Sequence, residues 1–264
     1  MDVRNRYLGI RIKLWICLIL SCLLSTACFT PNKDKSLFTP VSVPIQPINF
    51  NKAKILAKLI HADHQTTFYC NCRYDDRNNQ VDLQSCGYKV QHNTKRARRI
   101  EWEHIVPASV FGKKLPCWNN KLCCTKKDYC YKGRKCCQKI DPTFSTIEAD
   151  LHNIVPAIGE LNILRSNYDF AELPDVKSNQ FGSCNIKIDK VKHQIEPRHE
   201  VRGIIARAYL YMENIYKISL SKEQKKLFLR WNKKYPPTDW EIYWNTRITK
   251  IQGNDNSYIS NYNK

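Results

Sequence analysis

Residues 98–112 read RRIEWEHIVPASVFG and place acidic side chains and an imidazole inside an apolar run. From residue 100 onward the residues alternate between two faces, with a period of two that is typical of a β-strand. Pro107 is expected to end this strand. Because neighbouring strand residues point to opposite faces, Glu103 and His104 can serve one pocket only where the strand ends or bends.

These residue types suit the hydrolysis of a phosphodiester. That reaction needs a hard cation to neutralise charge and a base that accepts a proton from water. Glu103 offers a carboxylate, His104 offers an imidazole, and Asn153 in the stretch DLHN (150–153) offers an amide oxygen. One carboxylate and one amide oxygen can hold Mg²⁺, which keeps several waters. On spacing alone, a strand histidine bonded to a backbone carbonyl and two ordinary polar residues remain the alternative.

The charge of the chain is strongly positive. It has 264 residues, enough for one sizeable domain, with 43 Lys and Arg against 24 Asp and Glu. The formal charge of +19 suits a polyanion such as nucleic acid, an anionic membrane surface or an acidic polymer. A basic but soluble surface without such a partner is the alternative.

The first 50 residues indicate export. Residues 1–27 combine a basic start, the apolar stretch LWICLILSCLL (14–24) and small residues at Ser25 and Ala27, which is the pattern of a signal peptide. Cys28 follows directly, so a membrane tether through a lipidated Cys28 is the alternative to simple cleavage. Residues 28–50 contain four prolines and predict an extended tether. We therefore expect a periplasmic or secreted protein.

Ten cysteines follow Cys28, and an even number in an exported chain predicts disulfides. They are Cys70, Cys72, Cys86, Cys117, Cys123, Cys124, Cys130, Cys136, Cys137 and Cys184. Zinc bound by the dense thiols of residues 117–137 is the alternative, but this region has no two successive C-x-x-C pairs.

The remaining pattern predicts an α+β domain. Apolar spacing indicates a helix from residue 51 to about 60, another over 151–167, and three more in the C-terminal part. The first of these three is expected over 199–216. The expected cap residues are Asp150, Ser221 with Gln224, Thr238 with Glu241, and Gly253. Residues 112–144 read as a long polar loop. Strands and helices do not alternate as βαβ units, so little parallel sheet is expected.

Six stretches resemble, in the same order, the bacterial endonuclease I family, and the resemblance as a whole runs from about residue 52 to about residue 262. They read RIEWEHIVPASVFG, GRKC, EADLHNIVPAIGELN, RGIIARAYLYM, WNKKYPPTDWE and RITKIQGNDNSYI. The family consists of periplasmic or secreted nonspecific nucleases with a ββα-metal, or His-Me finger, active site. The resemblance implies that residues 51–264 form a nuclease domain with such a core, flanked by helices and stapled by disulfides.

The same resemblance assigns roles to four residues. It implies that His104 is the general base, that Glu103 and Asn153 bind the metal, and that Arg134 holds the scissile phosphate. It also implies one Mg²⁺ ion, which Mn²⁺ or Ca²⁺ can replace for binding, and cleavage of DNA and RNA that leaves 5′-phosphate and 3′-hydroxyl ends. We expect a monomer that binds DNA and RNA in a basic cleft, with backbone contacts from Arg98, Arg165, Arg198, Arg202 and Arg207.

The chain departs from the family pattern at an insertion of about residues 118–135. The insertion region brings four extra cysteines, Cys123, Cys124, Cys130 and Cys137, beside the six that match the family. We expect it to carry its own bridges and to extend the basic surface through Lys121, Lys126, Lys127 and Lys132.

Two other functions remain open at this point. One is a catalytically inactive cationic protein that binds nucleic acid or coats a surface. The other is a zinc-stabilised cysteine-rich protein that binds partners through the insertion.

Overall fold

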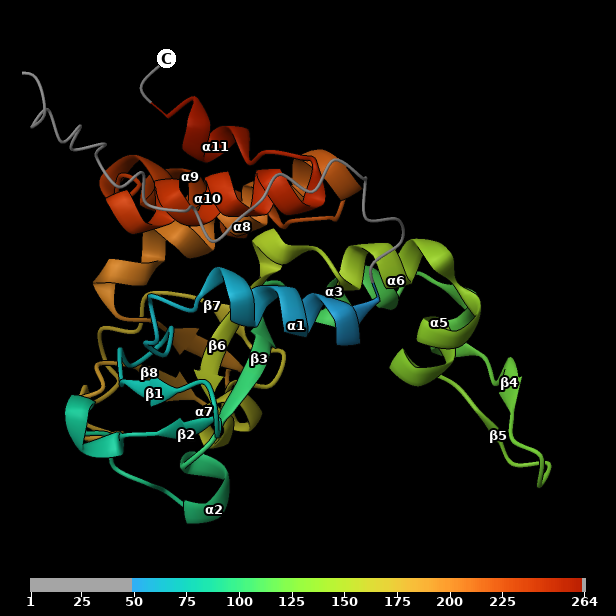
Figure 1. Ribbon diagram of the computed structural model, residues 1–264, viewed down its shortest axis with the longest axis horizontal. Helices are drawn as coiled ribbons and strands as arrows, with labels where there is room; N and C mark the ends of the chain where they lie inside the picture. The colour runs from blue at the N-terminus through green and yellow to red at the C-terminus, as the bar shows by residue number, and fades with distance from the viewer. Residues whose placement is uncertain (1–48, 263–264) are drawn as a thin grey trace, which may run out of the picture. The chain divides into compact units, whose positions relative to one another are not determined.

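The computed structural model describes residues 49–262, which belong to one compact unit (Figure 1). In chain order the elements are α1 (Phe50–Ile60), β1 (Tyr74–Asp75), β2 (Gln80–Val81), η1 (Leu83–Cys86), α2 (Thr94–Ala97), β3 (Ile100–His104), α3 (Ala108–Gly112), α4 (Pro116–Asn119), β4 (Cys123–Cys124), β5 (Cys130–Tyr131), α5 (Arg134–Ile140), α6 (Pro142–Glu148), η2 (Leu151–Asn153), β6 (Ile154–Ile158), α7 (Gly159–Arg165), β7 (Asp169–Phe170), β8 (Lys187–Asp189), β9 (Gln194–Glu196), α8 (His199–Tyr216), α9 (Lys222–Lys234), α10 (Asp239–Gln252) and α11 (Ser257–Ser260). This mixture of helices and short strands confirms the α+β class.

A two-stranded antiparallel ladder lies at the centre of the domain. Strand β3 pairs with β6 so that Glu103 faces Val155 and His104 faces Ile154. The strand predicted from residue 100 to Pro107 is therefore confirmed over residues 100–104, and it ends at His104, two residues earlier than expected. All five residues of β6 are buried, because the ladder is covered by packed elements on both faces.

The helix predicted over residues 151–167 is wrong in its central part. The chain forms a 3₁₀ turn at η2, then strand β6, and only then the short helix α7. Three of the five residues of β6 are β-branched, and they pack well when they are paired with β3. The apolar spacing of this segment therefore reflects a buried strand followed by a helix.

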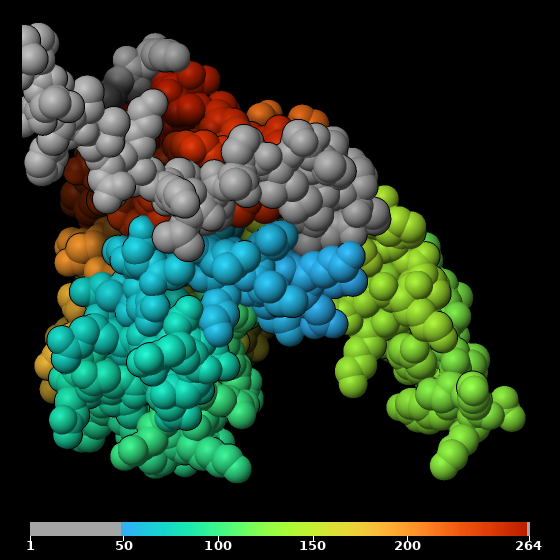
Figure 2. Space-filling model, in the orientation of Figure 1, coloured from blue at the N-terminus to red at the C-terminus, as the bar shows by residue number. Residues whose placement is uncertain are grey.

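The other sheets are small, and the described residues contain little parallel pairing, as expected. β1 pairs with β2 and β4 pairs with β5, both antiparallel. The third small sheet has the order β7-β9-β8, and only its β7–β9 pair is parallel. The predicted long loop over 112–144 contains α4, the β4–β5 hairpin, α5 and α6. This hairpin projects from the domain in Figures 1 and 2.

The C-terminal helices match their predicted caps closely. α8 covers residues 199–216 as expected, and α9 begins with a complete capping box of Ser221 and Gln224. Gly253 ends α10 in the left-handed conformation, with φ of 87°. The box predicted at the start of α10 is only half formed. Thr238 accepts from the backbone N–H of Glu241, but the Glu241 carboxylate binds Arg207 instead.

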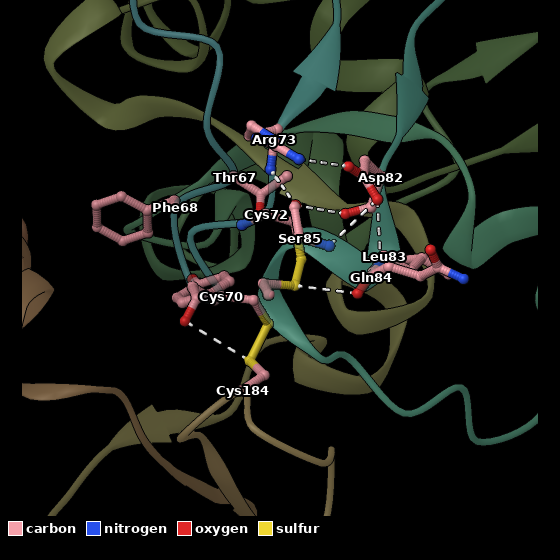
Figure 3. The surroundings of a disulfide bond; sticks show 12 residues. Thr67, Phe68, Cys70, Cys72, Arg73, Asp82, Leu83, Gln84, Ser85 and Cys184 are labelled. Atoms are coloured by element: carbon pink, nitrogen blue, oxygen red, sulfur yellow. Dashed lines mark hydrogen bonds and ion pairs between the residues drawn. A yellow bond between two sulfur atoms is a disulfide. The ribbon is translucent and has the colours of Figure 1, made fainter.

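The ten predicted cysteines form five disulfides: Cys70–Cys184, Cys72–Cys86, Cys117–Cys137, Cys123–Cys136 and Cys124–Cys130. The first two hold the segment before β1, where Cys72 N–H donates to Thr67 Oγ1 at 3.0 Å and Arg73 pairs with Asp82 (Figure 3). Since every cysteine between residues 49 and 262 is bridged, this part of the chain offers no thiolate for zinc.

The expectation that the insertion carries its own bridges is wrong for two of its three bonds. Only Cys124–Cys130 lies wholly within the insertion. The other two bonds each join an extra cysteine to one that matches the family, at Cys117 and Cys136. The hairpin is thus tied to α5 through Cys123–Cys136 as well as to itself, and α5 is tied in turn to α4 through Cys117–Cys137.

The predictions for the N-terminal region concern mostly residues outside the described part. The signal peptide of residues 1–27, the lipidated Cys28 and residues 28–48 of the tether lie there. The last two predicted tether residues instead start the domain, since Asn49 caps α1 and Phe50 is its first residue. No helix within residues 49–262 is long and apolar enough to span a bilayer.

A buried ion pair joins α8 to α10. Arg207 is 1% exposed and donates through Nε and Nη2 to the two carboxylate oxygens of Glu241, at 2.6 and 2.5 Å. Its Nη1 donates to the carbonyl of Tyr235 at 2.8 Å, beyond the end of α9. Both charged groups are buried away from water, so the attraction between them must offset the desolvation cost of each.

This pair generates a prediction about stability. Glu241→Ala should lower the free energy of unfolding by about 3–5 kcal/mol, because it leaves the charge of Arg207 buried without a carboxylate. The double variant Arg207→Met/Glu241→Leu should lose much less, since it removes both charges and keeps the volume. Urea unfolding followed by circular dichroism measures both. An equal loss in the single and double variants would contradict this account of the pair.

Candidate active site

His104 is the last residue of β3 and is buried against α1 and α6. Its Nε2 lies 2.7 Å from the backbone carbonyl of Glu148, and its ring lies 4.6 Å from the ring of Phe50. A carbonyl can only accept, so the proton sits on Nε2 and Nδ1 keeps its lone pair. Burial, and then the charge of Arg134, lowers the pKa of His104 to about 3. The imidazole is therefore neutral, with Nδ1 as its basic atom.

Glu103 lies on the other face of β3 and pairs with a buried guanidinium. Arg165, at the end of α7, donates through Nη1 to Glu103 Oε1 at 2.9 Å. The same guanidinium donates to the carbonyls of His104 and Ile105, at 3.0 and 2.5 Å. Burial raises the pKa of Glu103 to about 7, although Arg165 acts in the opposite direction. The positive charge of Arg165 therefore does not fully offset the desolvation of the Glu103 carboxylate.

Asn153 is the last residue of η2 and lies directly before β6. Two hydrogen bonds to Val106 hold its side chain. The backbone N–H of Val106 donates to Asn153 Oδ1 at 2.7 Å, and Asn153 Nδ2 donates to the Val106 carbonyl at 3.0 Å. This reciprocal pair determines which amide atom is the oxygen. A carbonyl-type oxygen has two lone pairs, so Oδ1 can still bind a cation.

Helix α8 positions the turn that carries Asn153. Asp150 caps η2 and accepts a hydrogen bond from the backbone N–H of His152 at 2.9 Å. Two tyrosines of α8, Tyr211 and Tyr216, donate to the other oxygen of Asp150 at 2.7 and 2.5 Å. In the stretch DLHN, the aspartate therefore has a structural part, which is to hold the turn that carries Asn153.

The ladder register places Glu103 and Asn153 on one face. The N–H of Ile105 donates to the carbonyl of Asn153, so the pairing continues one step beyond His104. Glu103 and Asn153 are then diagonal neighbours, whose side chains start about 7–8 Å apart. That separation lets a carboxylate and an amide oxygen reach one ion between them.

The residues present fit a hard divalent cation. A cation beside Glu103 would replace the solvation whose loss raises the pKa of this carboxyl group. Within the described part of the chain, no group of three or more His, Cys, Asp or Glu side chains is arranged to hold a metal. Glu103 and Asn153 offer one carboxylate and one amide oxygen, a set that Mg²⁺ accepts together with water.

Arg134, the first residue of α5, lies beside His104. Its Nε pairs with the carboxylate of Glu148, which is 1% exposed, and its Nη2 lies 3.5 Å from His104 Nδ1. The guanidinium also lies over the ring of Phe50, 5.0 Å from its centroid. The Arg134 side chain is 40% exposed, so it can meet a ligand from solvent. Its charge lowers the pKa of His104 and, to a smaller extent, that of Glu103.

The structure thus brings His104, Glu103, Asn153 and Arg134 to the end of one strand, but it separates the five predicted DNA-contacting arginines. Arg98 is exposed beside α2, and Arg198 is partly buried with its guanidinium on the Phe68 carbonyl. The other three are in the interior: Arg165 on the end of β3, Arg202 on Glu196, and Arg207 on Glu241. These three side chains are buried and hydrogen-bonded to internal partners, so they are not exposed to a phosphate backbone.

Two residues of this region were not predicted from the sequence. Glu148 binds His104 through its carbonyl and Arg134 through its carboxylate, and Gln138 donates to both oxygens of that carboxylate at 2.8 Å. Glu148 opens the family-like stretch EADLHN, which was the only available signal. Sequence alone could not distinguish this buried positioning residue from a helix-surface glutamate.

Comparison with known proteins agrees with this picture. The model of the Endonuclease I family matches residues 49–263. The chain is 42% identical over 236 residues to a protein named extracellular deoxyribonuclease from Aeromonas hydrophila, which covers 88% of this chain and 97% of that protein. It is 45% identical over 217 residues to endonuclease-1 of Buchnera aphidicola subsp. Baizongia pistaciae, which covers 80% and 82%. A periplasmic deoxyribonuclease from Aeromonas hydrophila is 40% identical over 227 residues, covering 83% and 90%. Since the family match spans nearly all of the described domain and these relatives align over most of their own lengths, the chain belongs to the endonuclease I family of nucleases.

Proposed function

We propose that this protein is a metal-dependent endonuclease that hydrolyses phosphodiester bonds of DNA without sequence specificity. The observation that carries the proposal is the arrangement at the end of β3, where Nδ1 of His104 carries no proton and accepts from Nη2 of the half-exposed Arg134 side chain at 3.5 Å. The names of the relatives, which include extracellular and periplasmic deoxyribonucleases, support the same activity. In this proposal β3, β6 and α7 are the ββα-metal core.

Each side chain has a distinct part in the proposed reaction. Nδ1 of His104 accepts a proton from the attacking water, and its Nε2–H keeps the ring oriented on the Glu148 carbonyl. Arg134 holds the scissile phosphate and stabilises the negative charge that grows on its oxygens. Glu148 keeps Arg134 in place through its carboxylate.

Glu103 and Asn153 are the residues that would hold one Mg²⁺ ion, and Mn²⁺ or Ca²⁺ could bind in its place. When bound, the ion supplies positive charge for the phosphate and for the departing oxygen. Arg165 keeps the carboxylate of Glu103 fixed at the strand end.

The proposed substrate is nucleic acid in general. Contacts to phosphates carry no sequence information, so a site that acts mainly through phosphates is nonspecific. We propose that RNA is cleaved as well as DNA and that the products carry 5′-phosphate and 3′-hydroxyl ends. We also propose that the protein acts as a monomer, and that it is exported to the periplasm or the medium. A lipid tether at Cys28 remains the alternative to free release.

The competing function is a catalytically inactive cationic protein that only binds nucleic acid. Digestion of plasmid DNA with and without EDTA distinguishes the two. The proposed nuclease cuts with magnesium and stops with chelator, whereas an inactive protein leaves the plasmid intact in both cases.

The variant His104→Ala tests the base. It should lose cleavage by about 10²–10⁴-fold, because no other side chain offers a basic nitrogen at that place. Its affinity for DNA should stay within about twofold, since a neutral ring contributes no charge to phosphate binding. Plasmid nicking rates and fluorescence anisotropy measure the two quantities. Cleavage near the wild-type rate would exclude His104 as the base.

The raised pKa of Glu103 predicts how metal binding depends on pH. Because the ion binds the carboxylate and the proton competes, affinity falls as pH drops below the pKa of about 7. Between pH 8 and pH 6 the dissociation constant for Mg²⁺ should rise about tenfold, with proton release on binding near pH 7. Isothermal titration calorimetry in two buffers of different ionisation enthalpy measures this. Glu103→Gln is the control, and it should bind weakly at both pH values. A wild-type affinity that does not change with pH would refute the ligand role of Glu103.

Glu148 can be tested through its link to Arg134. Glu148→Ala should reduce kcat by about 100-fold with a small change in KM, because it frees the Arg134 guanidinium while the backbone carbonyl still holds His104. Gln138→Ala is the matched control, since it removes the other donor to the same carboxylate and leaves the Glu148–Arg134 pair intact. Steady-state kinetics on a labelled duplex give both constants. If Gln138→Ala is as damaging as Glu148→Ala, the link to Arg134 is not what matters.

A further inference from the structure

The β4–β5 hairpin projects from the domain immediately before the helix that carries Arg134. Strand β5 ends at Tyr131, and α5 begins three residues later with Arg134. Figure 2 shows the hairpin and α5 as an arm, with a hollow on this face between the arm and the part of the domain that contains β1 and β2. The arm therefore borders the space beside the proposed active site.

The hairpin has the charge of a nucleic-acid contact. Residues 118–135 contain five lysines and one arginine against a single acid, Asp128. Lys126 and Lys127 occupy its exposed turn, and no ion pair joins them to any residue that the structure describes. Beside them Tyr129 is 69% exposed. Exposed lysines of this kind suit contacts to a phosphate backbone.

The hairpin is also rigidly joined to the catalytic groups. Cys124–Cys130 closes its two strands, Cys123–Cys136 ties it to α5, and Cys117–Cys137 ties α4 to the same helix. α5 begins with the guanidinium that lies beside His104. The turn is therefore held at a fixed distance from the scissile phosphate. Little conformational entropy is lost when the turn contacts DNA.

The length of the hairpin determines which part of the substrate it reaches. Arg134 lies six residues after Asp128, so the turn is at most about 20 Å from Arg134. At 3.4 Å per base pair, this distance corresponds to about six base pairs of duplex.

We propose that the β4–β5 hairpin is a clamp that contacts the phosphate backbone of double-stranded DNA within about six base pairs, on one side of the scissile bond. The inference rests on the proposed nuclease function, because it places the scissile phosphate at Arg134. It adds a second binding point outside the catalytic residues, and that point is formed by the inserted segment.

The test compares two doubly substituted proteins in EDTA, where binding is measured without cleavage. Lys126→Ala/Lys127→Ala should weaken the binding of a 30-base-pair duplex by about five- to tenfold at low salt, and should reduce the slope of log K against log salt by about 2. Fluorescence anisotropy across a salt series gives both numbers. As the duplex is shortened, the difference between variant and wild type should become smaller, and it should vanish once the duplex no longer reaches the turn from a centred site.

The matched control is Lys190→Ala/Lys192→Ala. These lysines are also exposed at the turn of a β-hairpin, between β8 and β9, so their removal causes the same loss of net charge. The control should keep the wild-type slope. Thermal melting of both variants checks that the folds are intact.

The outcomes separate this inference from the proposed function. If the wild type cuts plasmid with magnesium but the Lys126/Lys127 variant keeps the wild-type affinity and slope, the clamp is refuted and the nuclease stands. Equal losses in both double variants would also refute the clamp, since the effect would then come from net charge alone. If the variant loses affinity but the wild type never cuts, the nuclease function fails and the hairpin remains a DNA contact.

Discussion

A single buried guanidinium holds the strand end on which the proposed chemistry depends. Arg165 is 1% exposed and binds the carboxylate of Glu103 together with the backbone carbonyls of His104 and Ile105. A buried cation is tolerated only when several acceptors replace its water, and the end of β3 supplies them. In return, the backbone is fixed where the strand stops, so Glu103 and His104 leave the ladder in defined directions.

The same burial shifts the pKa values of Glu103 and His104 in opposite directions. It raises the pKa of Glu103 and lowers the pKa of His104, so both groups move toward their neutral forms. A neutral imidazole suits a base, whereas the raised pKa of Glu103 shows that the charge of Arg165 only partly offsets the desolvation of this carboxyl group. This imbalance supports the proposal that Glu103 and Asn153 bind a divalent cation.

Contacts from other parts of the domain fix the positions of these groups. Tyr211 and Tyr216 of α8 hold Asp150 and, through it, the turn that carries Asn153. Glu148 at the end of α6 joins His104 to Arg134. Disulfides tie the short helices α4 and α5 and the inserted hairpin into one unit, because this region has few helical turns of its own to bury. Positioning thus comes from contacts between segments that lie far apart in the chain.

The sequence by itself determined the local elements and the residue types of the site. The period of two in residues 100–104, the cap residues of α9 and the spacing of α8 are properties of neighbouring residues, and the structure agrees with them. Only the tertiary structure decided that residues 154–158 are a strand, because their pairing partner lies about fifty residues earlier. It also decided which cysteines pair, and that Arg165, Arg202 and Arg207 are internal ions whereas Arg134 faces solvent. An arginine looks the same in the sequence whether it meets a phosphate or a buried carboxylate, since only the packed fold determines how much water surrounds it.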